Sequence, residues 1–124
     1  MIAVIDDDVS VRGATRNLIR TLGYTVHAFA SAGEFLRSIH LREVSCIITD
    51  IQMPAMTGVE LQALLQTEGH RVPFIFITAF PQEAVRARAL SRGAVCVLTK
   101  PFDSRALIKC LDHALGRSAE GTSQ

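Results

Sequence analysis

The stretch CIITDIQMP, residues 46–54, carries an acidic side chain at the end of an apolar run. Cys46 to Thr49 are of types that suit a buried strand, and Asp50 follows them directly. Pro54 then interrupts regular structure, because its ring fixes φ and removes a backbone donor. The stretch therefore predicts a buried strand whose end presents a carboxylate at the mouth of a loop.

Apolar runs of the same kind recur at intervals of roughly 20 to 25 residues, with helix-like segments between them. The runs are IAVI (2–5), TVHAF (25–29), SCIIT (45–49), PFIFIT (73–78) and AVCVLT (94–99). Because they are apolar nearly throughout, they indicate strands that helices cover on both faces. This alternation predicts an α/β fold, a doubly wound parallel sheet of five strands with five helices.

Short local signals mark the ends of the predicted helices. The segments SAGE (31–34) and TGVE (57–60) have the spacing of a capping box, with a hydroxyl at the helix start and a glutamate three residues later. Glycines are placed to end the first, fourth and fifth helices, at Gly23, Gly93 and Gly116. These signals support the helices expected between the apolar runs.

Length and charge limit the classes of protein to consider. The 124 residues suit one domain, predicted for residues 1–116, and the polar segment 117–124 is expected to be a tail or the start of a linker to an output domain. A net charge of +1 gives no long-range field that would point to a nucleic acid or membrane partner, so composition alone says nothing about partners. No apolar stretch approaches the ~20 residues that span a bilayer, so we expect a cytoplasmic protein.

The cysteines and histidines show no metal-binding pattern. Cys46, Cys96 and Cys110 are odd in number, far apart and set among apolar residues. They are predicted to be buried, reduced thiols. The four histidines have no ligand spacing with one another or with the cysteines, and no chemistry is assigned to them.

Polar residues gather where the predicted strands end. In open α/β sheets, ligands bind outside the carboxyl ends of the strands. The residues expected there are Asp6, Asp7 and Asp8 after the first strand, Asp50 after the third, Thr78 on the fourth and Lys100 after the fifth. Each has an ordinary interpretation when taken singly, as a helix cap, a strand residue or a solvated charge. Together they predict one site at one edge of the sheet.

The chemistry of this set indicates phosphoryl transfer. Clustered carboxylates repel one another unless a cation lies among them, and oxygen ligands suit Mg²⁺, with Mn²⁺ as a substitute. A lysine and a hydroxyl can neutralise and hydrogen-bond a phosphoryl group, and a carboxylate can act as its nucleophile. The sequence has no P-loop, so a nucleotide is not the expected donor.

From Ile2 to Leu115 the chain resembles the receiver domains of two-component response regulators. The segments that carry the resemblance are VIDDD (4–8), IITDIQMPAMTG (47–58), FITA (76–79) and LTKPF (98–102). FITA and GAVCVLTKPF (93–102) are most similar to receivers whose regulators carry a helix-turn-helix output domain. The resemblance implies a flavodoxin-like (βα)₅ fold with strand order 2-1-3-4-5.

The resemblance also implies roles for the acidic residues. Asp50 is expected to accept a phosphoryl group from a sensor histidine kinase. Asp6, Asp7, Asp50 and the backbone carbonyl of Gln52 are expected to hold Mg²⁺. The chain would then be no turnover enzyme, but a phosphoacceptor that catalyses its own phosphorylation and dephosphorylation.

Other site residues follow from the same resemblance. Lys100 is expected to contact the phosphoryl oxygens, and Thr78 to move and hydrogen-bond the acyl phosphate. Pro101 is expected to follow a cis peptide bond. Pro54 and Gly58 are expected to shape the turn into the third helix.

Val97 departs from the family pattern, which usually has Tyr or Phe three residues before the lysine. Because valine has no ring to move inward, we expect helix four and strand five to be repositioned by packing alone. Phosphorylation is expected to switch the surface of helix four, strand five and helix five and to promote a homodimer through it. Control of transcription, and any contact with DNA, would require an output domain outside this chain.

Two alternatives stay open on the sequence. Asp6-x-Asp8 resembles the nucleophile and acid motif of haloacid dehalogenases, with Asp6 as the nucleophile. That class needs a further acidic pair after the lysine, and it leaves Asp50 without a role. The other alternative is a receiver-like module that signals by binding without phosphorylation, which the missing aromatic at position 97 favours.

Overall fold

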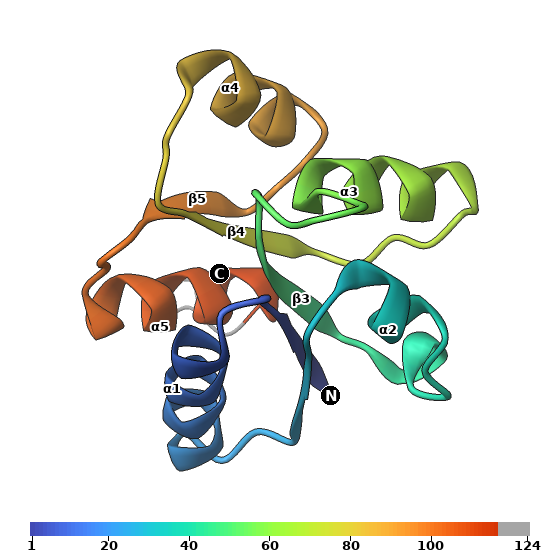
Figure 1. Ribbon diagram of the computed structural model, residues 1–124. Coiled ribbons are helices and arrows are strands. Elements are labelled where there is room, and N and C mark those ends of the chain that lie inside the picture. The colour runs from blue at the N-terminus through green and yellow to red at the C-terminus, as the bar shows by residue number, and fades with distance from the viewer. Residues whose placement is uncertain (117–124) are drawn as a thin grey trace.

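Five parallel strands form one sheet in the order β2-β1-β3-β4-β5, as predicted, in a computed structural model that describes residues 1–116 (Figure 1). The strands are β1 (Ile2–Ile5), β2 (Val26–Phe29), β3 (Cys46–Asp50), β4 (Phe74–Thr78) and β5 (Cys96–Thr99). Each lies within an apolar run of the sequence or within one residue of it. The predicted tail, 117–124, lies outside the described residues.

Helices cover both faces of the sheet, with α1 and α5 on one face and α2, α3 and α4 on the other (Figure 1). They are α1 (Val9–Thr21), α2 (Ala32–Leu36), α3 (Gly58–Thr67), α4 (Glu83–Ser91) and α5 (Ser104–Ala114), with a 3₁₀ turn at Leu41–Glu43. The longest, α1, has 13 residues. Within residues 1–116, none of these helices has the length and apolar character needed to cross a membrane.

The sheet separates two apolar cores. Successive side chains of a strand point to opposite faces, so Ile47 packs with α2, α3 and α4 while Ile48 packs with α1 and α5. Every residue of β1, β3 and β4 is buried, whereas the edge strands β2 and β5 are mostly half-buried. The three central strands thus give a rigid base for whatever follows their carboxyl ends.

The predicted helix caps are present, with one difference. Thr57 and Glu60 form the complete capping box of α3, with hydrogen bonds of 2.9 and 3.1 Å. At α2 the hydroxyl of Ser31 accepts from the backbone of Glu34, but the Glu34 carboxylate accepts from the backbone N–H of Ala30 rather than that of Ser31. The glycines predicted to end helices have positive φ, at Gly23, Gly93 and Gly116.

The prediction of three reduced thiols is wrong for two of them. A disulfide joins Cys96 on β5 to Cys110 on α5, and only Cys46 is free among the described residues. Sequence spacing gave no sign of this pairing, because it depends on which face of α5 lies against β5. Cys46 is fully buried as predicted, and burial raises the pKa of its thiol to about 12.

Candidate functional site

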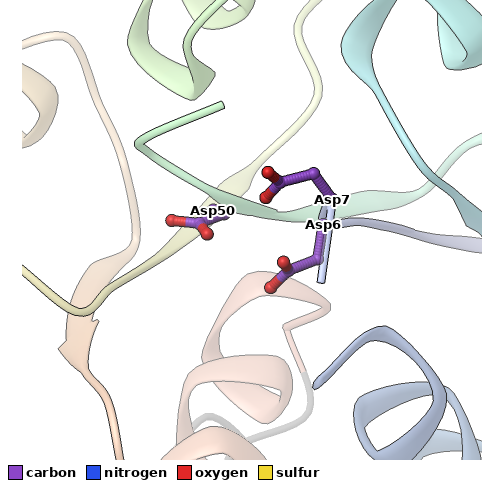
Figure 2. A group of neighbouring side chains, drawn as sticks. All are labelled: Asp6, Asp7 and Asp50. Atoms are coloured by element: carbon purple, nitrogen blue, oxygen red, sulfur yellow. The ribbon is translucent and has the colours of Figure 1, made fainter. Parts of the chain in front are cut away.

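The acidic residues meet at the carboxyl ends of β1 and β3, which are neighbours in the sheet. Asp6 and Asp50 are 3% and 7% exposed, and Asp7 is open to solvent. One carboxylate oxygen from each of the three lies within 4.8 Å of the others. Figure 2 shows the carboxylates of Asp6 and Asp7 extending from the end of β1 to the side on which Asp50 lies.

Lys100 reaches this group from the end of β5. Its Nζ atom lies 3.2 Å from Oδ2 of Asp6 and 3.1 Å from Oδ2 of Asp50. The peptide bond between Lys100 and Pro101 is cis, as expected. The backbone N–H of Lys100 donates to the carbonyl of Thr78 at 2.8 Å, which fixes the loop after β5 to the end of β4. One ammonium group therefore bridges two carboxylates from two different strands.

Backbone donors hold the same carboxylates from the other side. The N–H of Asp8 donates to Oδ1 of Asp6 at 2.9 Å, and the N–H of Gln52 donates to Oδ1 of Asp50 at 3.2 Å. The guanidinium of Arg12 donates to the backbone carbonyl of Asp6 at 2.8 Å. Both buried carboxylates are therefore held in one orientation, which a reactive group requires.

Asp8 does not join the acidic group. Its carboxylate caps α1 by accepting from the backbone N–H groups of Ser10 and Val11 at 2.8 and 3.1 Å. These two bonds lower the pKa of Asp8 below its ordinary value. A carboxylate held ionised in this way is unsuited to the general acid role that the dehalogenase alternative requires of it.

Thr78 ends β4 and is 1% exposed. Its hydroxyl donates to Oε1 of Gln52 at 2.6 Å and accepts from the backbone N–H of Phe80 at 3.0 Å. Nε2 of Gln52 in turn donates to the carbonyl of Phe80 at 3.5 Å. The threonine is therefore tied to the loop after Asp50, and the Phe80 side chain is 70% exposed.

The loop from Asp50 to α3 is shaped by close backbone approach. Gly58 donates its N–H to the carbonyl of Ile51 at 2.9 Å, and a side chain at this position would overlap the backbone oxygen of Asp50. Ala55 has φ of 68°, in the left-handed region that alanine rarely adopts. Pro54 precedes it and is exposed. Glycine is therefore required at position 58 because the backbone oxygen of Asp50 lies so close to it.

Val97 lies on β5 opposite Phe76 of β4 and is half-buried against the core beneath α3 and α4. Val85 of α4 packs against the same core. The position that usually holds an aromatic ring is therefore filled by a small side chain that already packs inward. Position 97 therefore carries no aromatic ring.

Comparison with known proteins agrees with this geometry. The profile of the response regulator receiver domain family matches residues 2–112. The chain belongs to this family. The receiver is 35% identical over 115 residues to the response regulator protein TodT of Pseudomonas putida, covering 93% of this chain and 51% of TodT. It is 37% identical over 117 residues to the transcriptional regulatory protein FixJ of Azorhizobium caulinodans, covering 94% and 56% of the two chains.

Solved structures give the same relationship. The response regulator StyR superposes with a TM-score of 0.86 at 37% identity, covering 98% of the receiver and 62% of StyR. The crystal structure of FixJ-N superposes with a TM-score of 0.82 at 28% identity, covering 95% of the receiver and 94% of that chain. The receiver thus spans about half the length of the curated relatives that it matches.

Burial and charge act against each other at the centre of the site. Desolvation raises the pKa of Asp6, as does the nearby Asp50, while the N–H of Asp8 and the charge of Lys100 oppose the rise. For Lys100, burial alone would lower the pKa, but its hydrogen bond to Asp50 and the two negative charges raise it overall. Burial and the nearby Asp50 therefore disfavour the ionised form of Asp6, and an additional cation beside it would oppose that effect.

The donor set fits a divalent cation. Three carboxylates face one ammonium group, so the site keeps an excess of negative charge, and all the donors are hard oxygens. Asp7 is exposed, which leaves room for water or a phosphate oxygen beside the ion. Receiver domains typically bind Mg²⁺, and the acidic group of this receiver could hold it.

Two contributors were not found by sequence reasoning. Arg12 fixes the backbone of Asp6, but an arginine in the first turns of a helix carries no signal of that role. Gln52 was named for its backbone carbonyl, whereas its side chain makes the bond to Thr78. Both depend on side-chain conformations that spacing along the chain does not specify.

Replacing Asp6 with asparagine should stabilise the metal-free receiver at neutral pH, because it removes a carboxylate whose ionised form burial and Asp50 disfavour. The pKa of Asp6 in the folded state lies above its unfolded value of 3.8. The parent therefore gains stability as the pH falls through that raised pKa, and the advantage of asparagine should shrink.

Urea unfolding in chelator, at about pH 7 and about pH 4, measures both effects. Asp112→Asn on α5 is the matched control and should show neither. Adding Mg²⁺ should reverse the order, because the parent binds the ion better. An Asp6→Asn variant that is less stable than the parent in chelator at neutral pH would contradict this account of the site.

Proposed function

We propose that this receiver accepts a phosphoryl group on Asp50 in a Mg²⁺-dependent reaction and so switches its surface. The observation that carries the proposal is the position of Lys100, whose Nζ bridges Asp6 and Asp50 at 3.2 and 3.1 Å. The oxygens of a phosphoryl group that approaches Asp50 carry negative charge. The positive charge of Lys100 lies where it can neutralise them. Asp50 is held at the end of a central strand, with its carboxylate near the open side of the site.

In this mechanism a carboxylate oxygen of Asp50 forms a bond to phosphorus as the bond from phosphorus to the donor's leaving atom breaks. Asp6, Asp7, Asp50 and the backbone carbonyl of Gln52 would hold Mg²⁺. The ion, when bound, supplies positive charge to the phosphoryl oxygens. Lys100 orients and neutralises the same group, and Pro54, Gly58 and Pro101 shape the loops that carry these residues.

The donor we propose is a phosphohistidine of a sensor histidine kinase in the cytoplasm. Relatives of this receiver are named as response regulators and transcriptional regulatory proteins. We therefore place it in regulators of transcription, in which a separate output domain would contact DNA. Phosphorylation of the receiver would act on the output domain through a homodimer formed by α4, β5 and α5. Small-angle scattering of the receiver with bound beryllofluoride should then show twice the mass of the monomer.

Acetyl phosphate with Mg²⁺ should label the receiver with one phosphoryl group on Asp50, and Asp50→Asn should abolish the label. Asp112→Asn is the control and should be labelled as the parent is. Peptide mapping by mass spectrometry locates the modified residue. A label on Asp6 would support the dehalogenase alternative instead and would overturn the proposal.

Replacing Gln52 with methionine should strengthen the binding of beryllofluoride, a phosphoryl mimic, by about twofold to tenfold. To reach a group on Asp50, the Thr78 hydroxyl must give up its 2.6 Å bond to Gln52. Methionine has a similar length but offers no comparable acceptor, and a hydrogen bond contributes about 0.5 to 1.5 kcal/mol. Fluorescence or NMR titration measures the dissociation constant, and an unchanged value would show that this bond does not restrain Thr78.

A receiver that signals by binding alone is the second candidate, and Val97 is the observation that favours it. Amide NMR spectra with and without beryllofluoride and Mg²⁺ separate the two. Shifts that extend from Asp50 to α4 and β5 support phosphorylation-dependent switching. A spectrum that does not change supports the second candidate.

A further inference from the structure

The disulfide between Cys96 and Cys110 connects β5 and α5, two elements of the surface through which a homodimer is proposed. Cys96 begins β5, the edge strand of the sheet, and Cys110 lies in α5. Their Cα atoms are 6.5 Å apart across a sequence separation of 14. The Cα distance falls within the range of about 4.4 to 6.8 Å found for disulfides. The fold itself therefore brings the two cysteines within bonding range.

Accessibility separates this pair from the third cysteine. Cys96 and Cys110 are both partly exposed to solvent. Cys46 is fully buried, and burial raises its pKa to about 12, so its reactive thiolate form is scarce at neutral pH. The pair is therefore more accessible to a dissolved thiol or disulfide than Cys46 is. The chain thus contains its own internal control.

The setting decides what kind of disulfide this is. Stable disulfides belong to secreted proteins, whereas those in the cytoplasm are usually transient and respond to redox conditions. The proposed partner is a cytoplasmic kinase domain, and both cysteines of the pair are partly exposed. We propose that Cys96 and Cys110 form a reversible thiol–disulfide switch whose oxidised form weakens the response of the receiver to phosphorylation.

A low-molecular-weight disulfide such as oxidised glutathione is the oxidant in this scheme. One cysteine thiolate attacks it, forming a mixed disulfide and releasing one small thiol. The second cysteine thiolate attacks the protein sulfur of that mixed disulfide, forming the bond between Cys96 and Cys110 and releasing the second small thiol. Two protein thiols are oxidised, one small disulfide is reduced, and the two protons end on the released thiols.

The effect on signalling rests on the proposed function. The bond closes the segment from Cys96 to Cys110, which contains Lys100, and ties β5 to α5. It does so in the arrangement in which the Thr78 hydroxyl is bonded to Gln52. A cross-link formed in this arrangement opposes any movement of β5 against α5, so it favours the state in which Thr78 stays bonded to Gln52 over one in which Thr78 reaches a group on Asp50.

The bond is tested first. Incubation of the receiver with oxidised glutathione should give a linked pair of peptides containing Cys96 and Cys110, which a reductant removes. Cys46 should react with an alkylating reagent only after denaturation. Reduction should lower Tm by about 10 °C in the parent and in Cys46→Ser, and not in the double variant Cys96→Ser with Cys110→Ser. Failure to find the linked peptides would overturn the proposal.

The regulatory effect is tested by beryllofluoride titration of the oxidised and reduced receiver. Binding to the oxidised form should be at least about fivefold weaker. The double variant should bind as the reduced parent does under both conditions. Equal affinities of the two parent forms would overturn the switch. No binding to either form would overturn the proposed function and the effect on signalling together, while the linked peptides would still establish the bond.

Discussion

Replacing Lys100 with methionine should slow the phosphorylation of Asp50 by acetyl phosphate by about a hundredfold to a thousandfold. Methionine keeps the length and much of the packing of the side chain but removes its charge. The lost group is the one cation placed beside both Asp6 and Asp50 among the described residues. Charge that develops on the phosphoryl oxygens in the transition state would then lack this partner.

The control for this experiment is Lys109→Met. Lys109 is an exposed lysine on α5 and has no ion pair among those found in residues 1–116. Its replacement should leave the rate unchanged. Rates come from mass spectrometry of the phosphorylated fraction over time at a fixed Mg²⁺ concentration. A Lys100→Met variant labelled within a few-fold of the parent rate would remove Lys100 from the proposed mechanism.

Replacing Gly58 with alanine should destabilise the receiver by about 2 to 3 kcal/mol, because the added methyl group has no space. It would overlap the backbone oxygen of Asp50 and would lie 3.1 Å from the ring of Phe76 and 3.2 Å from the methyl group of Thr49. These neighbours belong to the buried central strands, so they cannot move away cheaply. The variant should also be phosphorylated more slowly, since Asp50 itself must shift.

Gly13→Ala is the matched control, because a side chain at Gly13 in α1 would meet nothing within 4 Å. In the interior of a helix this change should stabilise the receiver by about 0.5 to 1 kcal/mol. Urea unfolding of both variants measures the contrast. If Gly58→Ala and Gly13→Ala changed the free energy of unfolding by similar amounts, the loop after β3 would adapt to an added methyl group more readily than its contacts indicate.

The fold could be predicted from local patterns, because each central strand is apolar nearly throughout. IAVI coincides with β1, and the apolar run at 73–78 contains all of β4. The capping box at Thr57 and Glu60 could also be predicted, because it involves residues that are close together in the sequence. Features that depend on interactions between sequence neighbours could therefore be predicted without knowledge of any tertiary contact.

Features that depend on tertiary packing could not be predicted from the sequence. The pairing of Cys96 with Cys110 depends on which face of α5 packs against β5, and the spacing of residues along the chain does not specify that face. The bond from Thr78 to Gln52 requires two side-chain conformations on different loops. The polar residues at the strand ends could be predicted as a group, because parallel strands in one sheet end at the same edge. Their individual partners could not.

The metal dependence of labelling at Asp50 tests the central claim most directly. The account requires that Asp6, Asp7 and Asp50 together hold a divalent cation that makes Asp50 a phosphoacceptor. Peptide mapping after treatment with acetyl phosphate should find the phosphoryl group on Asp50 in the presence of Mg²⁺ and almost none in excess chelator. Equal labelling in chelator, or a label on any other residue, would contradict the account.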